Sequence, residues 1–583
     1  MSPAYFREKH PTMRRIVLMI HLVLGLSSAL CAQAIHDPIT KMMDIDDPSD
    51  VDPDLVERLE YLLEHPLDLN ASSVADIRSS SLFSPYQLPV MTAYRERHGK
   101  IFSLYELSLL EGFGDDFVRR LAPFVTFAPE TVSLNERSQG FRHDVAIRSG
   151  YRWSEDDGSD GSYAVRYSLK AGSAFSATMA LSRPAGKEKW YPDTGTGSLL
   201  WNIGRGDWRL IAGDFHARFG QGLTLWTGSF MTALTVPDTF MKKASGISQP
   251  WSFTGISALS GIASDFSRGA FTVSALVAFP GLKSAVSAPD KLQIMPAVNV
   301  AWRGRNGQIS LTGLACVPFR TGEKQYLTGL DAAFCLNGVN VFGEISADWV
   351  KRRVKALAGT RFKAGEHLDL AVQARGFQGD QYGLAAGGEF LFREKVRGYF
   401  VLDATGYQVP EDEDDVFSLQ LKSQLSVELT FGLQWLLKVR VSERFRTWGL
   451  PLRSDIRADV VCNLSPFTLL MRLNVLSCDS VGGLSYFEGG YSSDRLRVHL
   501  RQGFFIIDDW DDRIYVYERD APGSFNVPAM YGRGLWTSAV AGIDLMRKLR
   551  LYLRASFTAY PFMKPEKKKP GKAELKLQLQ YRF

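Results

Sequence analysis

Residues 572–583, at the end of the chain, alternate strictly between apolar and polar side chains, and this pattern constrains the fold more than any other feature. The apolar set is Leu575, Leu577, Leu579, Tyr581 and Phe583. Successive side chains of a β-strand point to opposite faces, so one face of this segment is apolar and the other is polar. Hydrocarbon can cover the first face and water the second, as a strand of a membrane-spanning barrel requires.

This ending resembles the C-terminal signature of bacterial outer-membrane β-barrels, with Tyr581 and Phe583 as the candidate membrane-assembly signal. The resemblance implies a location in the outer membrane of a Gram-negative bacterium. It also implies two partners, the outer-membrane lipid and the barrel assembly machinery.

The period-two pattern extends over residues 140–583, interrupted by clusters of turn residues. In residues 495–501, three basic residues and a histidine alternate with apolar ones. A charge facing lipid at mid-bilayer costs about 2–4 kcal/mol, so these polar side chains are expected to face a wet lumen. We predict a mainly β fold, a large antiparallel transmembrane barrel of about 24 strands (between roughly 22 and 26), because a single-chain bacterial barrel has an even number. Unpaired strand edges are costly in lipid, so the barrel must close.

Residues 1–34 are predicted to be a signal peptide. Arg14 and Arg15 precede an apolar run over residues 16–26, and residues 32–34 supply small side chains for cleavage. Residues 35–53 are acidic, and they contain no glycine for the sharp turn of a calcium loop. We therefore expect a solvated linker there.

Residues 54–127 carry helix signals in place of the alternation. Three capping boxes, each a hydroxyl residue followed three positions later by an acid or amide, predict three helix starts. They are Ser73 with Asp76, Ser84 with Gln87, and Ser103 with Glu106. We expect a small all-α domain of helices of about ten residues joined by tight turns.

Within this domain, Gly112, Phe113 and Gly114 place two glycines around one apolar residue between two predicted helices. Residues 109–121 resemble a helix-hairpin-helix motif, and residues 70–127 resemble the competence-related helix-hairpin-helix module. In DNA-binding members of that family, exposed N–H groups at the start of the second helix bind a phosphate.

A helix-hairpin-helix domain followed by a barrel resembles a family of Bacteroidota outer-membrane proteins. Residues 219–223 and 515–525 of the predicted barrel also support this resemblance. Together with the patterns above, it predicts a signal peptide at 1–34, a linker at 35–53, a periplasmic helix-hairpin-helix domain at 54–127 and a barrel at 140–583. It implies no defined activity.

The charge of the helical domain bears on whether it binds DNA. Residues 54–127 contain eleven acidic and seven basic side chains, so the net charge is 7 − 11 = −4. Nonspecific DNA affinity depends on neutralising phosphates with Lys and Arg, which disfavours DNA binding here. Asp115 and Asp116 also occupy the helix start where a phosphate would bind. The candidate nucleic-acid contacts are Gly112, Phe113, Gly114, Arg95, Arg97, Lys100, Arg119 and Arg120.

The sequence contains no GxSxG, HExxH or Walker-type motif and no CxxC pair. The cysteines that follow the predicted signal are far apart: Cys316, Cys335, Cys462 and Cys478. We expect His216 to face the lumen and the acidic cluster at 508–512 to form a solvated turn. We accordingly predict no enzymatic activity, no metal and no cofactor.

These inferences give one functional hypothesis, one alternative, and a third possibility, which is a transport role for the barrel alone. The first is a non-enzymatic outer-membrane barrel whose periplasmic helical module plugs the lumen or docks an envelope partner, in passage or assembly at the outer membrane. The alternative is a DNA-uptake receptor in which the helix-hairpin-helix module captures DNA.

Overall fold

The computed structural model describes Ile39, Met42, residues 53–127 and residues 140–583, with short internal gaps. The gaps are at 157, 173, 205–207, 229–233, 252, 254–256, 285–287, 321, 394, 412–413, 433, 451, 525 and 564–568. The predicted signal peptide and almost all of the predicted linker lie outside the described residues.

Residues 53–127, here called the helical module, contain short helices around one apolar core. The elements are α4 (Pro53–Glu64), α5 (Val74–Ser79), α6 (Gln87–His98), α7 (Leu104–Ser108), α8 (Asp115–Leu121) and the 3-10 helix η2 (Ala122–Phe124). Two-residue strands, β1 (Leu67–Asp68) and β2 (Val125–Thr126), pair in parallel. Leu59, Ile77, Met91, Phe113 and Leu121 are among the buried core side chains. None of the helices in the described ranges is long and apolar enough to cross a membrane.

The three predicted capping boxes are confirmed. The backbone N–H of Asp76 donates to Ser73 Oγ at 3.1 Å, that of Gln87 to Ser84 Oγ at 3.3 Å, and that of Glu106 to Ser103 Oγ at 3.2 Å. The expected helix length is wrong for α5, α7 and α8, which have 6, 5 and 7 residues. Residues with positive φ turn the chain soon after α5 and α7, at Ser81 (φ 59°) and Gly112 (φ 81°).

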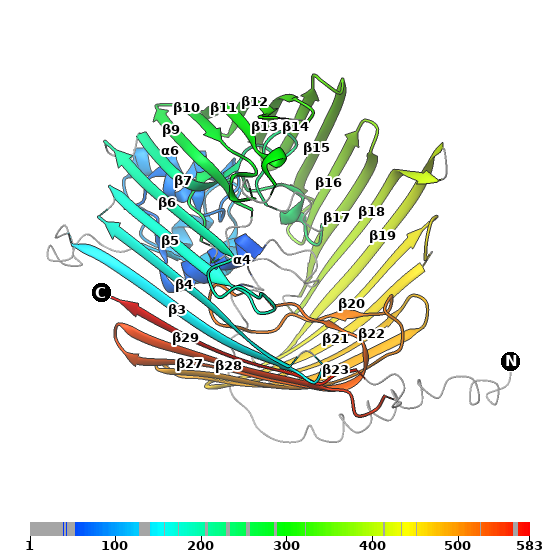
Figure 1. Ribbon diagram of the computed structural model, residues 1–583. Helices are drawn as coiled ribbons and strands as arrows, with labels where there is room; N and C mark the ends of the chain where they lie inside the picture. The colour runs from blue at the N-terminus through cyan, green and yellow to red at the C-terminus, as the bar shows by residue number, and fades with distance from the viewer. Residues whose placement is uncertain are drawn as a thin grey trace.

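Residues 140–583 form a closed antiparallel barrel (Figure 1). Its strands are β3 (Phe141–Ser154), β4 (Gly158–Ala171), β5 (Phe175–Arg183), β6 (Thr194–Ile203), β7 (Trp208–Arg218), β8 (Gly246–Ser248), β9 (Leu259–Arg268), β10 (Phe271–Ala278), β11 (Gln293–Gly304), β12 (Gly307–Pro318), β13 (Gln325–Leu336), β14 (Val339–Asp348), β15 (Arg353–Lys363), β16 (Leu368–Phe377), β17 (Gln381–Phe392), β18 (Val396–Glu411), β19 (Asp414–Phe431), β20 (Trp435–Arg446), β21 (Leu452–Leu464), β22 (Phe467–Ser477), β23 (Val481–Ser492), β24 (Leu496–Ile507), β27 (Gly532–Met546), β28 (Leu549–Ala559) and β29 (Lys572–Arg582).

The wall of this barrel has 24 strands, as predicted. β8 is not a separate wall strand, because β7 pairs with β9 over most of its length and with the three-residue β8 only at its end. The ring closes where β29, the last strand of the barrel, pairs with β3, the first strand. The closed ring leaves no wall strand with an open edge, so the backbone groups of the wall are paired around the barrel.

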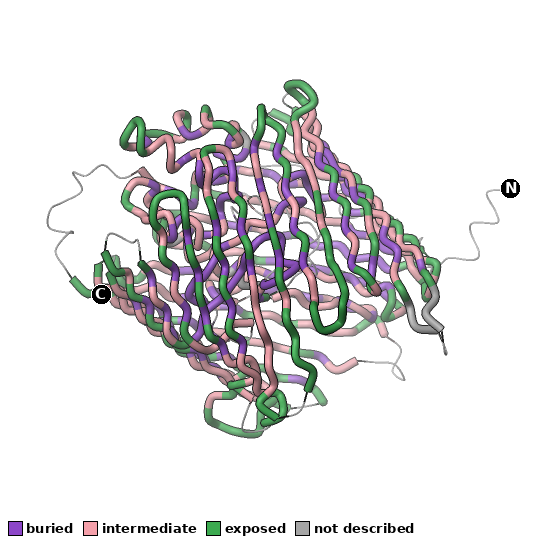
Figure 2. Tube along the Cα trace, turned by 90° about the horizontal axis from the view of Figure 1, so that it is seen from above, coloured by how far each residue is buried: buried purple, intermediate pink, exposed green. Residues whose placement is uncertain are grey.

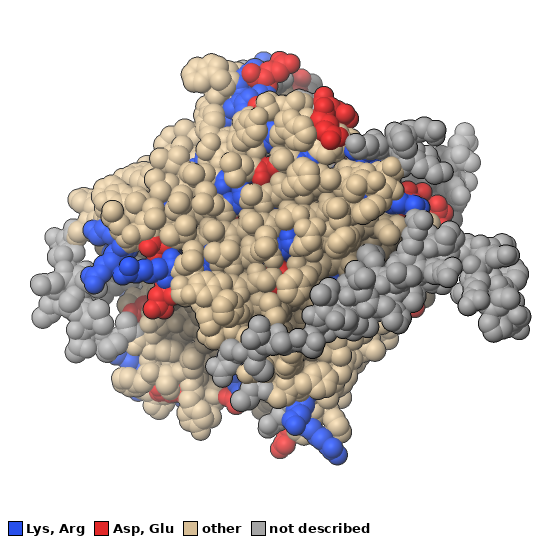
Figure 3. Space-filling model, turned by 90° about the horizontal axis from the view of Figure 1, so that it is seen from below, with Lys and Arg blue, Asp and Glu red and all other residues tan. Residues whose placement is uncertain are grey.

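Alternation along each strand separates an apolar exterior from a polar interior. In β10, Phe271, Val273 and Val277 are exposed, whereas the intervening Thr272 and Ser274 are buried. The same alternation of buried and exposed positions runs along neighbouring strands in Figure 2, and few charges lie on the face shown in Figure 3. Apolar side chains outside and polar ones inside reverse the arrangement of a water-soluble protein, so hydrocarbon is the medium that suits this exterior.

Two long connections fold into the barrel and are here named loop A (residues 219–258) and loop B (residues 508–531). Loop A contains β8 and the 3-10 helix η3 (Pro237–Phe240), and loop B contains β25 (Ile514–Tyr515) and β26 (Ala529–Met530). Both loops leave the barrel end opposite to the one at which β3 begins and β29 finishes, here called the terminal end. Two further 3-10 helices, η4 (Leu282–Ser284) and η5 (Pro289–Lys291), lie between β10 and β11.

Candidate functional site inside the barrel

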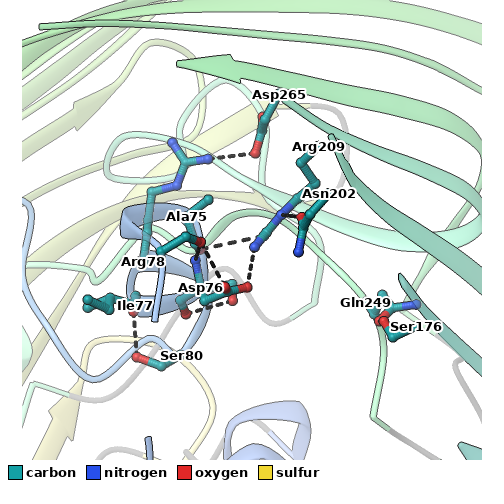
Figure 4. Close-up of polar contacts among 12 residues, drawn as sticks. Ala75, Asp76, Ile77, Arg78, Ser80, Ser176, Asn202, Arg209, Gln249 and Asp265 are labelled. Atoms are coloured by element: carbon teal, nitrogen blue, oxygen red, sulfur yellow. Dashed lines mark hydrogen bonds and ion pairs between the residues drawn. The ribbon is translucent and has the colours of Figure 1, made fainter. Parts of the chain in front are cut away.

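Helix α5 of the helical module is bonded to the inner wall through two ion pairs (Figure 4). Asp76 pairs with Arg209 of β7, and Arg78 Nη2 lies 2.7 Å from Asp265 Oδ2 of β9. Arg209 is only 2% exposed, and it also donates to the carbonyl of Ala75. Both wall residues lie near the terminal end of their strands, so the module occupies that end of the lumen.

Helix α4 contacts loop A and β4 through a cluster of rings and cations. The rings of Tyr61 and Trp251 are stacked at 3.8 Å, and Lys170 Nζ of β4 donates to the Tyr61 hydroxyl at 2.6 Å. Arg58 lies 5.1 Å from the Trp251 ring, and burial lowers the pKa of its guanidinium from the usual value to about 10. A buried cation over an aromatic face contributes to the attraction between α4 and loop A.

The predicted hairpin glycines lie in the turn between α7 and α8. Gly112 and Gly114 both have positive φ, at 81° and 70°, and Phe113 between them is buried in the core of the module. A Cβ on Gly112 would lie 2.4 Å from the Tyr86 ring, so this position requires glycine. The Gly112 carbonyl accepts a hydrogen bond from Gln87 at 2.8 Å.

This hairpin lies against the barrel wall. Tyr86 is buried in a cluster that includes Cys335 of β13, and Cys335 Sγ donates to Glu111 at 3.5 Å. A Cβ on Gly114 would lie 3.7 Å from Lys363 Nζ of β15. The hairpin therefore contacts β13 and β15, while Asp115 at the start of α8 is exposed.

The five predicted basic contacts differ in their exposure. Arg97 and Arg119 are exposed, whereas Lys100 is half-buried. Arg95 donates to two backbone carbonyls within the module, and burial lowers its pKa. Arg120 is half-buried and acts electrostatically on an aspartate of loop A.

Loop A is bonded to the inner wall at Glu344 of β14. The Glu344 carboxylate accepts hydrogen bonds from the backbone N–H groups of Gln221, Leu223 and Thr224 at 2.6, 3.1 and 2.9 Å, and from Thr224 Oγ1 at 2.7 Å. A Cβ on Gly220, where φ is 58°, would lie 2.7 Å from the same carboxylate. Glycine at this position therefore lets the backbone approach the carboxylate closely.

A second loop A contact is made by Asp238 of η3. Its carboxylate lies 2.8 Å from Lys243 Nζ and 2.9 Å from Arg361 Nη1 of β15, and Arg361 is also paired with Asp369 at 2.8 Å. Burial opposes ionisation of Asp238, but Lys243, Arg361 and Arg120 outweigh it and hold the pKa of this carboxyl well below its usual range. The helical module thus interacts electrostatically with loop A as well as with the wall.

Loop B is bonded to the wall on the side where the ring closes. Arg554 of β28 is 2% exposed and pairs with Glu518 of loop B and with Glu574 of β29. Lys576 Nζ lies 2.8 Å from Asp520 of loop B. Buried charges are stable only when paired, and here the pairs with Glu518 and Asp520 join loop B to β28 and β29.

The predicted wet surroundings of Arg501 are wrong. Arg501 faces inward as expected, but it is 5% exposed. Its Nε donates to Glu488 at 2.6 Å and its Nη1 to the Tyr517 carbonyl of loop B at 2.7 Å, while Arg519 of loop B lies 2.9 Å from Glu488. Loop B fills this part of the lumen and replaces water as the partner of the wall charges.

The acidic cluster at 508–512 is also more than the predicted solvated turn. Asp512 is fully buried and accepts hydrogen bonds from the backbone N–H groups of Cys478 and Ser480, each at 2.7 Å. It connects the start of loop B to the turn between β22 and β23. The other predicted lumenal residue, His216, is buried at the end of β7, 3.2 Å from Thr227 Oγ1.

The helical module, loop A and loop B meet at one point. The backbone N–H of Gly523 in loop B donates to Glu60 of α4 at 2.6 Å, and a Cβ on Gly523 would lie 2.7 Å from the Phe253 ring of loop A. Arg148 and Arg166 of the wall lie 4.3 and 4.8 Å from the Phe253 ring. The helical module, loop A and loop B, which are far apart in the chain, thus contact one another inside the ring.

The predicted assembly residues, Tyr581 and Phe583, lie at the seam of the ring, which is the pairing of β29 with β3. Phe583 stacks on His143 of β3 at 4.6 Å and on Tyr581 at 5.1 Å, and the backbones of Phe583 and His143 exchange two hydrogen bonds of 2.8 and 3.0 Å. Both aromatic side chains are exposed on the outside of the barrel. They occupy the terminal end, where an interfacial aromatic side chain is favourable.

Among the described residues, Cys316, Cys335, Cys462 and Cys478 form no disulfide, and no group of three or more potential metal ligands comes together. The residues that tie the module and loops to the wall, such as Arg209, Asp265 and Glu344, escape sequence analysis because any lumen-facing charge fits the same alternation. The glycines at 220 and 222 were the one available signal, since both adopt positive φ beside the Glu344 contact.

The fold and site together define a closed antiparallel barrel with a helical module and two loops inside it. No protein-family model matches the sequence, and no curated protein matches it. Among solved structures, the siderophore receptor PirA from Pseudomonas aeruginosa matches with a TM-score of 0.41 and 8% identity, over 76% of this chain and 81% of that one. The FrpB iron transporter from Neisseria meningitidis matches with a TM-score of 0.37 and 8% identity, over 76% and 81%. OccK3 (OpdO) from Pseudomonas aeruginosa matches with a TM-score of 0.29 and 10% identity, over 76% and 95%. Likenesses this distant carry no argument about the activity of this chain.

Proposed function

We propose that this protein is an outer-membrane barrel whose lumen is closed by the helical module, and that it serves gated passage at the outer membrane. The observation that carries the proposal is the set of ion pairs between α5 and the wall, Asp76 with Arg209 and Arg78 with Asp265. Such pairs can be broken and re-formed, so the module can act as a plug with two states.

The orientation of the barrel in the membrane supports this proposal. The chain enters the barrel at β3 and leaves it at β29, both at the terminal end, which we infer to be the periplasmic end. The helical module would then close the periplasmic mouth, while loop A and loop B enter from the outside. A periplasmic partner that binds the module could open the lumen, which joins the plug and docking roles in one mechanism.

The direct test is planar-bilayer conductance of the full-length protein. A ring of 24 strands without a plug would enclose a wide aqueous channel. We expect low conductance from the intact protein and higher conductance from variants in which the module is loosened. High conductance from the intact protein would contradict the proposal.

The alternative, a DNA-uptake receptor that uses the helix-hairpin-helix module, requires the hairpin to leave the wall. Gly112 and Gly114 face Tyr86 and Lys363, and no observation of the structure favours DNA. We expect the full-length protein in detergent to leave a labelled DNA duplex unshifted at low salt. A salt-sensitive shift that weakens in Gly114→Asp would favour the alternative instead.

The seam predicts how the chain ends affect assembly. Deleting Phe583 removes the ring stack on His143 and two backbone hydrogen bonds between the first and last strands. We expect a several-fold decrease in folded barrel, measured as the heat-modifiable band on a gel. Phe557→Ala is the matched control, because Phe557 is an exposed phenylalanine on β28 away from the seam, and it should fold at the wild-type level.

A further inference from the structure

The inner face of β19 to β22 carries an excess of positive charge. Leu421, Phe445, Ile456 and Phe467 are exposed on the outer face, so the alternate positions of these four strands face the lumen. Among the inward side chains of these strands that the structure describes, the charged ones are the basic Lys422, Lys438, Arg440, Arg444, Arg446, Arg453, Arg457 and Arg472, and the acidic Glu428, Asp455 and Asp459. Their net charge, 8 − 3 = +5, equals that of the whole chain. We call these residues the basic face.

The register of these strands places like charges directly opposite one another. Lys422 of β19 is opposite Arg444 of β20, and Arg444 is opposite Arg453 of β21. Arg440 of β20 is opposite Arg457 of β21. Like charges in opposed positions destabilise a sheet, so a wall selected for stability alone would avoid three such pairs.

Arg440 lies at the centre of the basic face, and two of its hydrogen-bond donor atoms have no acceptor in the described part of the protein. It is 6% exposed, and its closest acidic contact is Asp455 at 3.4 Å from Nη2. Its Nε and Nη1 are buried, and neither has a hydrogen-bond acceptor among the described residues. The next carboxylate, Asp459, is bonded to Arg457 and Arg472 at 2.6 Å each. A buried guanidinium with two free donors is costly unless a further acceptor binds it.

We propose that the basic face is a binding site for an oxyanion-bearing solute, with Arg440 as its central contact. The planar guanidinium fork matches the paired oxygens of a phosphate or a carboxylate, and such an anion would also relieve the opposed cations around it. This inference deepens the proposed function by naming the class of solute that the barrel handles, and it rests on that function only for the passage of the bound anion.

The test is calorimetric titration of the full-length mature protein in detergent micelles with inorganic phosphate and, separately, with succinate. We expect saturable binding of at least one of them at low ionic strength, and no saturable heat with sodium chloride. Arg440→Gln should weaken the binding roughly tenfold or more, because it removes the charge and the fork. Without added anion, the same variant should unfold at the wild-type temperature or higher, since it removes a poorly paired buried cation.

Lys355→Gln provides the matched control. Lys355 lies on β15 at an inward position outside the basic face, 5.8 Å from the Phe377 ring. The substitution removes one positive charge, as Arg440→Gln does, but the anion affinity should stay at the wild-type value. Arg440→Lys keeps the positive charge but lacks the paired N–H donors of the guanidinium, so it should bind the anion more weakly than wild type. This variant tests the proposal if Arg440→Gln fails to fold. Absence of binding to both oxyanions, or wild-type affinity in the Arg440 variants, would overturn the proposal. Binding in micelles requires no passage, so its outcome is independent of the conductance tests of the plug.

Discussion

Replacing Arg209 with glutamate is expected to loosen the helical module and raise the single-channel conductance of the full-length protein several-fold. The Arg209 guanidinium is almost completely buried and pairs with Asp76 of α5. The Asp76 side chain is 39% exposed, so the loss of Arg209 alone costs less than in a fully buried pair, but a glutamate at this position adds repulsion between two carboxylates. The module should leave the wall at α5, and amide hydrogen exchange in α5 should become faster.

The reversed pair is the internal check on this result. In Arg209→Glu combined with Asp76→Arg, the two charges exchange places and attract again, so conductance should return toward the wild-type value. Arg268→Glu is the matched control, because Arg268 is an exposed arginine at the same end of β9, and this variant should conduct as wild type does. Equal conductance in wild type and Arg209→Glu would show that α5 does not control the lumen.

Replacing Glu344 with alanine is expected to release loop A from the wall and to destabilise the folded barrel. Three backbone N–H groups and one hydroxyl of loop A donate to this carboxylate. Each buried donor left without an acceptor costs about 1–3 kcal/mol, so the loss is several kcal/mol unless the loop moves into water. We expect limited proteolysis to cut loop A in the variant but not in the wild type, and the unfolding temperature to fall.

Two further variants separate this contact from general loss of charge. Glu344→Gln retains one carbonyl oxygen as an acceptor and should give an intermediate rate of cleavage. Glu428→Ala removes an inward carboxylate of β19 whose ion-pair partner, Lys438 at 3.0 Å, lies on the neighbouring wall strand β20, so loop A should stay resistant. Cleavage of loop A at equal rates in Glu344→Ala and wild type would show that other contacts hold the loop.

The architecture was predictable because its causes are local. Alternation of side chains along a strand records which face meets hydrocarbon, and it predicted the barrel and its number of strands from residues such as Leu575 and Leu577. A capping box joins residues three positions apart, so Ser73 and Asp76 were enough to predict the start of α5. Both signals can be recognised within a dozen neighbouring residues.

The contents of the lumen were decided only by the tertiary structure. Alternation indicates that Arg501 and Arg554 point inward, but not whether water or protein surrounds their charges. In the structure, Arg501 donates to a backbone carbonyl of loop B and Arg554 pairs with a carboxylate of loop B. The partners of the buried charges lie far away in the chain, as with Arg78 and Asp265, which are 187 residues apart. Electrostatic attraction depends on distance in space, so the sequence alone determined a ring with a polar interior, and only folding determined which charges meet inside it.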